Sequence, residues 1–401
     1  MPIRDYVVVT IAYWAFTLTD GALRMLVLLH FHDLGYSPVS LAFLFLLYEL
    51  FGVFANLFGG WMGARFGLNR TLTLGIVLQI VALVALSAHS PDWIEWAAVV
   101  WVMGAQALSG IAKDLTKMSS KSAVKMVSSD GSLFRLVAAL TGSKNALKGV
   151  GFFVGAALLG WQGFDRSLWV MAMALVVVLV AVMALLTADL GRASARPPIR
   201  GLLTKSSAIN QLSAARFFLF GARDIWFVVA LPVFLDETLG WSFESIGAFL
   251  AVWVIGYGIV QALAPKVLGA IDDDVRVAQL LPVPLAVVTA FIAVAVSADR
   301  MVTFAVVGGL LGFGFLFALN SAMHSYLILA YSTTADEVAM DVGFYYSANA
   351  AGRLVGTLLS GTLYLAWGLT GAMWGAFGFL AAAWVISRRL PAKPLPFAVA
   401  T

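Results

Sequence analysis

The strongest constraint on this chain is a series of apolar stretches, each about as long as a helix that crosses a lipid bilayer. Such a helix needs about 20 mostly apolar residues. Every backbone polar group in lipid must be satisfied within the protein, so each stretch is expected to be helical. The twelve predicted spans are residues 6–31, 39–63, 71–88, 93–117, 134–160, 167–187, 207–235, 244–268, 277–297, 301–331, 341–367 and 370–387. The sequence therefore predicts an all-α integral membrane protein with twelve transmembrane helices.

Composition supports this class and excludes several others. Hydrophobic residues make up 61% of the 401 residues and charged residues only 11%, against about 25% charged in an ordinary soluble domain. The net charge is +4, but the basic residues are scattered among apolar stretches rather than gathered in a soluble basic domain, which argues against nucleic-acid binding. The absence of cysteine excludes disulfides and thiolate ligands. No metal site and no cofactor are predicted.

The distribution of basic residues in the loops predicts the orientation. Cytoplasmic loops of membrane proteins carry an excess of Lys and Arg. Only Arg166 and Arg300 fall on one side of the predicted topology. The other side holds Arg4, Arg65, Arg70, Lys121, Lys125, Arg192, Arg196, Arg200, Lys205, Lys266, Arg276, Arg388, Arg389 and Lys393. We therefore expect a multi-pass membrane protein with both termini in the cytoplasm.

The chain repeats itself at half its length. Leu34-Gly-Tyr-Ser after the first span recurs as Leu239-Gly-Trp-Ser after the seventh, at an offset of 205. At an offset of 201, Gly142, Gly151, Gly155 and Gly160 recur as Gly343, Gly352, Gly356 and Gly361. Two six-span halves in parallel repeat describe a transporter architecture with its substrate site between the halves. The predicted divisions are an N-terminal half at 1–190, a cytoplasmic linker at 191–206, a C-terminal half at 207–390 and a cytoplasmic tail at 391–401.

Charges inside the apolar stretches indicate what such a site would bind. The third, sixth, ninth and twelfth spans have uncharged interiors and are expected to face lipid. The cations well inside other spans are Arg24, Lys144, Lys148, Arg216, Arg223 and Arg353, and the carboxylates are Asp20, Glu49 and Asp224. A charge near the bilayer centre costs roughly 2.5 to 3.5 kcal/mol. A hydrated cavity for a multiply charged anion would accommodate the three cations left unmatched.

Roles can be assigned to these residues as expectations. The predicted substrate-binding residues are Arg24, Lys113, Lys117, Lys144, Lys148, Arg223, Arg353 and His324. The predicted proton-coupling residues are Asp20, Glu49 and Asp224.

Other interpretations of the same charges stay open. Asp20 and Arg24 stand four residues apart, which fits a structural ion pair as well as a functional one. Arg223 is adjacent to Asp224 but is expected to point about 100° away from it on a helix. Lys121 continues the stripe of Lys113 and Lys117 and is most simply a solvated residue at the cytoplasmic surface.

Two lysines distinguish the halves. Lys144 and Lys148 share a helical stripe with the repeated glycines, but the second half has Tyr345 and Asn349 at the equivalent positions. Small residues let helices approach closely. The glycines are therefore expected to be a packing framework, and the lysines a specialisation of one half.

Two motifs resemble those of the major facilitator superfamily. The run Gly60-Trp-Met-Gly-Ala-Arg-Phe-Gly-Leu-Asn-Arg70 is similar to its gating loop, which implies gating roles for Gly60, Arg65 and Gly67. The acidic residue that usually precedes the arginine is replaced by Ala64. Gly142, Gly151 and Gly155 are similar in spacing to its antiporter signature, with Ala156 in place of the proline. The resemblance implies the twelve-helix, two-half fold of that superfamily.

Three further segments resemble the ArsJ family of organoarsenical efflux permeases. They are Leu18-Thr-Asp-Gly-Ala-Leu-Arg-Met-Leu-Val-Leu-Leu-His-Phe-His32, Leu108-Ser-Gly-Ile-Ala-Lys-Asp-Leu-Thr-Lys-Met-Ser-Ser-Lys121 and Leu140-Thr-Gly-Ser-Lys-Asn-Ala-Leu-Lys-Gly149. The resemblance implies efflux of 1-arseno-3-phosphoglycerate and hence arsenate resistance. It also implies a functional link to glyceraldehyde-3-phosphate dehydrogenase, which makes this ester when it uses arsenate in place of phosphate.

Two alternatives remain. One is an antiporter that exchanges an ordinary phosphate ester for inorganic phosphate. The other is a membrane-embedded enzyme, although Gly-x-Ser-x-Gly and His-Glu-x-x-His are both missing from the sequence. We expect a transporter whose partners are a small anionic substrate and the lipid bilayer, with no enzymatic activity.

Overall fold

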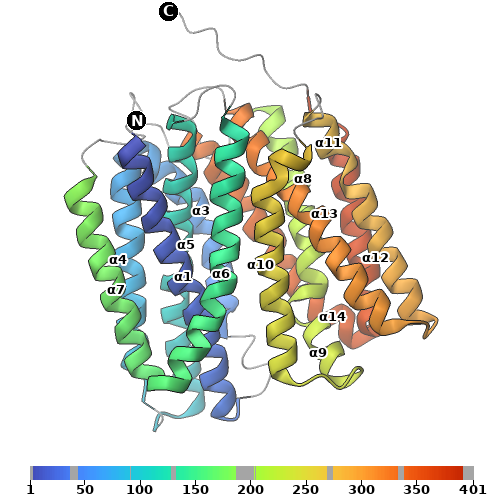
Figure 1. Cartoon of the computed structure of the whole chain (residues 1–401), viewed down its shortest axis with the longest axis horizontal. Helices are drawn as coiled ribbons and strands as arrows, with labels where there is room; N and C mark the ends of the chain where they lie inside the picture. Colours follow the sequence, from blue (N-terminus) through green and yellow to red (C-terminus); the bar gives the residue numbers. More distant parts are fainter. Residues whose placement is uncertain are drawn as a thin grey trace, which may run out of the picture.

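The structure is a computed structural model that describes residues 3–36, 44–90, 92–127, 132–186, 203, 205–268, 274–332 and 338–391. Within these ranges every regular element is a helix (Figure 1). The first half contains α1 (Ile3–Asp33), α3 (Leu46–Phe66), α4 (Leu68–Ser87), α5 (Glu95–Val127), α6 (Leu133–Gln162) and α7 (Phe164–Leu185). The second half contains α8 (Ser207–Phe227), α9 (Ala230–Glu237), α10 (Phe243–Leu268), α11 (Asp274–Leu280), α12 (Pro282–Ser297), α13 (Val302–Tyr331) and α14 (Val338–Ser387).

These helices make the twelve predicted crossings. The long helix α14 is broken at Trp367 and Gly368, where Gly368 adopts a positive φ of 61°, so α14 contains two spans. The pairs α8 with α9 and α11 with α12 each form one crossing. Among the described residues, eight helical stretches are long and apolar enough to span a membrane by length and composition. The remaining crossings, α3, α5 and α6, carry more polar and small residues, which include the charges of the site described below.

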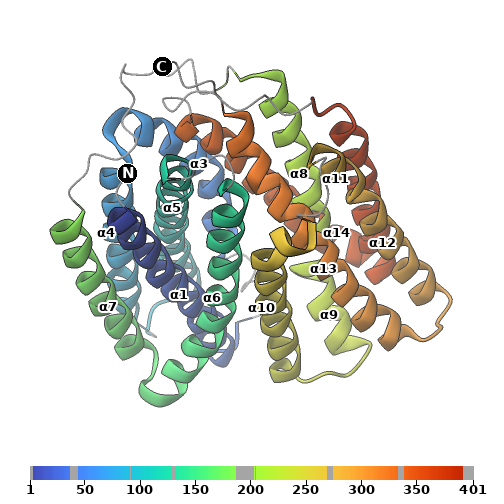
Figure 2. The same cartoon turned by 45° about the horizontal axis from the view of Figure 1, so that its top comes forward.

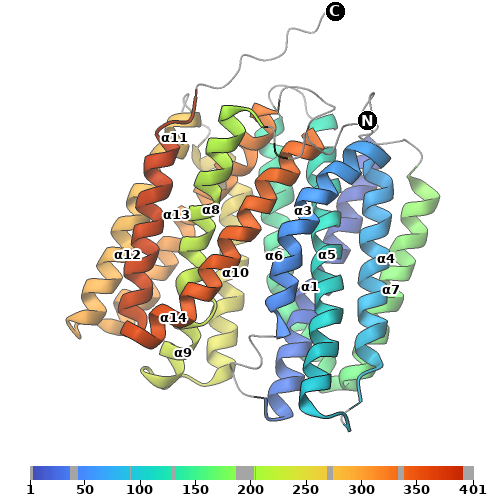
Figure 3. The same ribbon diagram turned by 180° about the vertical axis from the view of Figure 1, so that it is seen from behind.

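The crossings divide into two six-span bundles that lie side by side, α1 to α7 in one and α8 to α14 in the other (Figures 1 and 2). We call the end of the molecule where α1 begins the near end and the opposite end the far end. The view from behind shows α3 and α14 facing each other where the halves meet (Figure 3). The predicted boundary at 190 and most of the predicted linker and tail lie outside the described residues.

The uncharged spans lie on the outside of the bundles. In α7 the side chains of Val177, Val180 and Met183 are 60 to 68% exposed, and α4, α7 and α12 flank the molecule in Figure 1. An apolar helix that leaves its large side chains exposed is suited to lipid. This arrangement agrees with the prediction that every third span faces the bilayer.

The repeated glycines mark equivalent helix crossings in the two halves. A Cβ on Gly151 would lie 2.5 Å from the carbonyl oxygen of Leu18, so α6 and α1 cross with their backbones in contact. Gly352 meets the backbone of α8 in the same way. The fourth pair differs, because Gly160 and Gly361 have no neighbour within 4 Å of such a Cβ. The prediction of a packing framework therefore holds for the central glycines and is wrong for the last pair.

Two further glycine contacts close the near end between the halves. A Cβ on Gly142 in α6 would lie 2.5 Å from the oxygen of Gly258 in α10, and one on Gly343 in α14 would lie 3.0 Å from the Cα of Gly60 in α3. Within the described residues, every hydrogen bond and ion pair that joins the halves lies between mid-depth and the near end. The halves are thus packed against each other at the near end.

Candidate functional site

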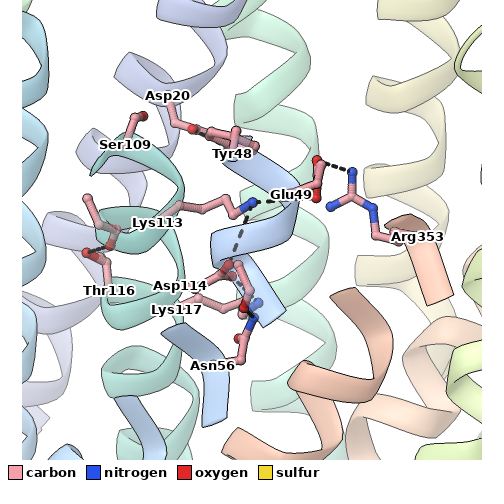
Figure 4. A network of polar contacts seen from close by, with 12 residues as sticks. Asp20, Tyr48, Glu49, Asn56, Ser109, Lys113, Asp114, Thr116, Lys117 and Arg353 are labelled. Atoms are coloured by element: carbon pink, nitrogen blue, oxygen red, sulfur yellow. Dashed lines mark hydrogen bonds and ion pairs between the residues drawn. The ribbon is translucent and has the colours of Figure 1, made fainter. Parts of the chain in front are cut away.

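An ion-pair network lies at mid-depth where the halves meet (Figure 4). Four carboxylates take part: Asp20 of α1, Glu49 of α3, Asp114 of α5 and Asp224 of α8. The cations are Arg24 of α1, Lys113 and Lys117 of α5, Lys148 of α6, Arg223 of α8 and Arg353 of α14. The structure therefore brings together nine of the eleven residues predicted to bind substrate or to couple protons. Asp114 is an additional member.

Glu49 and Arg353 form the centre of this network. Arg353 donates through Nη2 to Glu49 Oε1 at 2.7 Å and through Nε to Asp224 Oδ2 at 3.0 Å. Arg24 Nη2 lies 3.7 Å from the same Glu49 oxygen, and Lys113 Nζ lies 4.0 Å from Oε2. Glu49 thus meets cations from both halves.

Asp20 pairs across a helix crossing rather than along its own helix. Its Oδ2 lies 3.3 Å from Lys148 Nζ, and its Oδ1 accepts a hydrogen bond of 2.6 Å from the Tyr48 hydroxyl. No ion pair joins Asp20 to Arg24 in the described part of the chain, since Arg24 contacts Glu49 instead. The alternative of a local Asp20–Arg24 pair is therefore wrong, because the close α1–α6 crossing brings Lys148 nearer.

Two other expectations from helical spacing need correction. Arg223 bonds to its neighbour Asp224 through Nε at 2.6 Å, because the long arginine side chain turns back despite the 100° between adjacent positions. Lys121 is not solvated: the residue is 5% exposed, and its ammonium donates to Thr141 Oγ1 at 2.6 Å. Lys117 forms an ion pair with Asp114 on its own helix.

The cations of the network are more accessible than the carboxylates. The side chains of Arg24 and Arg353 are 28% and 21% exposed, whereas those of Glu49 and Asp224 are 8% and 1% exposed. The carboxylates are therefore buried beneath the cations, and the cations keep part of their surface accessible. An anion that enters between the halves would meet positive charge first.

Besides Lys121, two further interior cations have no carboxylate partner within the described residues. Lys144 donates to Asn145 Oδ1 at 3.2 Å. Arg216 donates to Asn349 Oδ1 at 2.9 Å and to the carbonyl oxygen of Ser321 at 3.3 Å. The interior thus holds more cations than carboxylates.

His324 is placed apart from this network. The residue lies on α13 with 1% exposure, and neither ring nitrogen has a hydrogen-bond partner in the described structure. Its neighbour one turn away, Asn320, is equally buried and also lacks partners for its amide atoms. No hydrogen bond or ion pair among the described residues joins His324 to the predicted substrate-binding cations.

The predicted gating loop forms the turn between α3 and α4. Gly67 has a positive φ of 93° and links the two helices directly. Arg65 stacks its guanidinium 5.1 Å from the ring centroid of Trp61, and no ion pair involves it in the part of the chain described here. This packing is consistent with Ala64, which provides no carboxylate. Gly60 lies at the near-end contact between halves.

Several residues of the site were not predicted from the sequence as functional candidates. Asp114 stands between Lys113 and Lys117, and that neighbourhood is a signal for a shared network. Tyr48 and Asn145 adjoin charged residues but carry no distinctive spacing. Within the described ranges, no group of three or more His, Asp or Glu side chains could hold a metal ion.

A two-half helical bundle with a charged interior between its halves defines a secondary membrane transporter. The family model for the Major Facilitator Superfamily matches residues 9–327, and the chain belongs to this superfamily. A search of curated protein sequences finds no significant match.

Solved structures show the same fold. A bacterial homologue of the iron transporter ferroportin in an outward-facing state has a TM-score of 0.79 at 11% identity, covering 96% of this chain and 99% of the other. The human organic anion transporter MFSD10 (TETRAN) has a TM-score of 0.76 at 15% identity, covering 96% and 100%. The proton:xylose symporter XylE has a TM-score of 0.76 at 12% identity, covering 97% and 96%. At these identities the likeness is one of fold.

Proposed function

We propose that this chain exports an anionic organoarsenical phosphate ester, 1-arseno-3-phosphoglycerate, across the bacterial inner membrane by alternating access. The observation that carries the proposal is the layer of accessible cations over buried carboxylates at mid-depth. The ester has an oxyanion group at each end. Arginine suits bidentate contact with such groups, and lysine supplies a compact charge.

The choice of this ester depends on the sequence resemblance to the ArsJ family. The three segments that carry the resemblance belong to α1, α5 and α6, and each contributes to the ion-pair network. The resemblance is therefore strongest where the cations gather. The human organic anion transporter shares only the fold, but its name shows that this fold accommodates organic anions.

Orientation gives the observed conformation a place in the export cycle. If the near end faces the cytoplasm, as the basic loop residues predict, the glycine contacts at that end close the cytoplasmic side. A carrier closed toward the cytoplasm is in the state from which an exporter releases its cargo to the outside.

Proton coupling would result if the substrate and the carboxylates exchange the same cations. A substrate oxyanion that takes Arg353 or Lys148 removes a cation from Glu49 or Asp20, and a carboxylate that loses its cation binds a proton more readily. Export that frees a carboxylate in this way would carry a proton outward together with the ester.

Exchange of an organophosphate for inorganic phosphate is the second candidate. The observation that favours it is that Asp20, Glu49 and Asp224 all have cation partners already. Inorganic phosphate could then replace the departing ester on the cations without any change of protonation.

Uptake into everted membrane vesicles tests the proposal. The ester is generated in place from arsenate, NAD, glyceraldehyde 3-phosphate and glyceraldehyde-3-phosphate dehydrogenase, and arsenic inside the vesicles is measured. We expect accumulation only when the chain and the dehydrogenase are both present. Equal accumulation without the dehydrogenase would exclude the organoarsenical cargo. Collapsing the proton gradient should change the rate of proton-coupled export, whereas preloaded phosphate should drive exchange.

A further inference from the structure

Arg216 in α8 is a buried cation that the proposed function does not use. Its residue exposure is 3%, and no carboxylate lies within ion-pair distance among the described residues. A guanidinium stays protonated in proteins, so Arg216 cannot avoid its charge by titration. A buried charge without an opposite charge is strongly unfavourable. An anion is the missing component of this environment.

The neighbours of Arg216 orient its side chain without neutralising it. The Nε and Nη1 groups donate to two neutral oxygens, the side-chain oxygen of Asn349 and the carbonyl oxygen of Ser321. The guanidinium carbon lies 3.7 Å from the ring centroid of Phe220, which gives a cation–π contact. These bonds use two of the five N–H donors of the guanidinium. Its charge is therefore not neutralised, and its remaining N–H donors have no hydrogen-bond partner among the described residues.

Comparison of the halves shows how the environment of Arg216 differs from its counterpart in the first half. Lys148 and Asn349 are equivalent positions at the repeat offset of 201. In the first half Lys148 meets Asp20 of α1, which forms a cation–carboxylate pair. In the second half Asn349 meets Arg216 of α8, which forms a cation–amide pair. The α8–α14 crossing thus holds Arg216 against a neutral amide, beside its own ion pair between Arg353 and Asp224.

A chain of neutral hydrogen bonds continues from Arg216 into the first half. Ser321, whose carbonyl oxygen binds Arg216, accepts from Gln261 Nε2 at its hydroxyl at 3.1 Å. Gln261 Oε1 accepts from Asn145 Nδ2 at 2.6 Å, across the interface between the halves. Asn145 Oδ1 then accepts from Lys144, another cation without a carboxylate partner among the described residues. Amides and hydroxyls can turn to donate to an oxyanion, whereas a carboxylate would repel it.

We propose that Arg216, with the neutral side chains linked to it, forms an oxyanion site separate from the ion-pair network. The site takes one phosphate or arsenate group of the cargo, and the network takes the other group. This inference rests on the proposed function and adds the second half's contribution to it. A single inorganic phosphate binds at Arg216 in preference to the network, because no carboxylate has to be displaced there.

Phosphate binding to the purified full-length protein in lipid nanodiscs tests the site. Inorganic phosphate is titrated calorimetrically into wild type, Arg216→Gln, Asn349→Asp and Arg388→Gln. Arg216→Gln should weaken phosphate binding by roughly tenfold or more, because a charged hydrogen-bond donor is lost. Arg388 is exposed and stacks near Trp384 at the near end, so Arg388→Gln should bind as wild type does.

Asn349→Asp gives the more specific test, since it places a carboxylate beside Arg216, which has none among the described residues. It should weaken phosphate binding by a similar factor while the melting temperature stays the same or rises. If Arg216→Gln fails to fold, Asn349→Asp decides the question alone. Unchanged phosphate affinity in the folded variants, or no phosphate binding by wild type, would overturn the site.

The outcome is independent of the organoarsenical cargo. Phosphate binding that requires Arg216 would stand even if everted vesicles accumulated no arsenic. Conversely, the variants of Arg216 and Asn349 could bind phosphate as wild type does while organoarsenical export is observed. That result would retain the proposed function and exclude this site.

Discussion

Arg353 and Glu49 form an ion pair, with Nη2 and Oε1 2.7 Å apart, that joins the two halves of the molecule at mid-depth. The same guanidinium holds Asp224 of its own half at 3.0 Å. When the halves move relative to each other, Arg353 can follow only one of these carboxylates. The pair therefore contributes to the stability of the conformation in which the near end is closed.

A double-mutant cycle measures this contribution. Glu49→Gln, Arg353→Gln and the double variant are compared by thermal unfolding in detergent. Removal of one partner takes away the shortest contact of the other, although Glu49 keeps Arg24 and Lys113 nearby and Arg353 keeps Asp224. We therefore expect a coupling free energy of about 1 kcal/mol. Single effects that simply add in the double variant would show that the two residues do not stabilise each other.

Lys148 and Lys144 should differ in their effects on stability. Lys148→Ala leaves Asp20 without its cation, and breaking a buried pair in this way costs about 3 kcal/mol or more. Lys144 has no carboxylate partner among the described residues, so its removal leaves no buried carboxylate unpaired. Lys144→Ala should therefore unfold close to the wild-type temperature. We expect both variants to lose vesicle transport.

Asp20→Asn provides the control for this comparison. Combined with Lys148→Ala, it should recover much of the lost stability, because the buried carboxylate is then also removed. Wild-type transport in both lysine variants would show that neither residue contacts the cargo.

The glycine framework predicts a contrast along a single helix. Gly155→Leu in α6 should prevent stable insertion, because a Cβ there would overlap the backbone of Ala22 in α1. Gly160→Leu, on the same helix, meets open space and should express at the wild-type level. Fluorescence-detected size-exclusion chromatography distinguishes the two, and equal profiles would contradict the crossing.

Closure of the near end can be tested by cross-linking, because the native chain has no cysteine to interfere. Lys125 Nζ donates to the carbonyl oxygen of Leu329 in the other half at 2.7 Å. A short bifunctional thiol reagent should therefore link Lys125→Cys to Leu329→Cys and stop transport. Each single variant treated with the same reagent should remain active. Continued transport by the linked protein would show that this end need not open.

The spans and their division into halves could be predicted because both depend on local signals. Apolar length marks each crossing, and the break at Trp367 and Gly368 lies where the sequence predicts two spans. The offset of 201 predicted equivalent helix crossings because a glycine is needed wherever backbones touch. Gly160 and Gly361 repeat without such a contact, and the structure offers no packing reason for them.

The partners of the buried charges could not be predicted, because they come from helices distant in sequence. Glu49 and Arg353 are 304 positions apart, and no spacing rule connects them. Local rules also misled: Arg223 folds back onto Asp224, and Lys121 is buried although it continues a stripe toward the predicted surface. Sequence indicated most of the charges that lie inside, whereas only the fold indicates which carboxylates neutralise them.

The separation between glycines and charges on α6 has a consequence for evolution and for engineering. Gly151 and Gly155 fix the distance between α6 and α1, while Lys148 one turn away supplies charge without setting that distance. Cargo preference can therefore change by substitution at the charged positions while the helix framework is retained. The second half already illustrates such divergence, with Asn349 in place of a lysine on an unchanged backbone crossing.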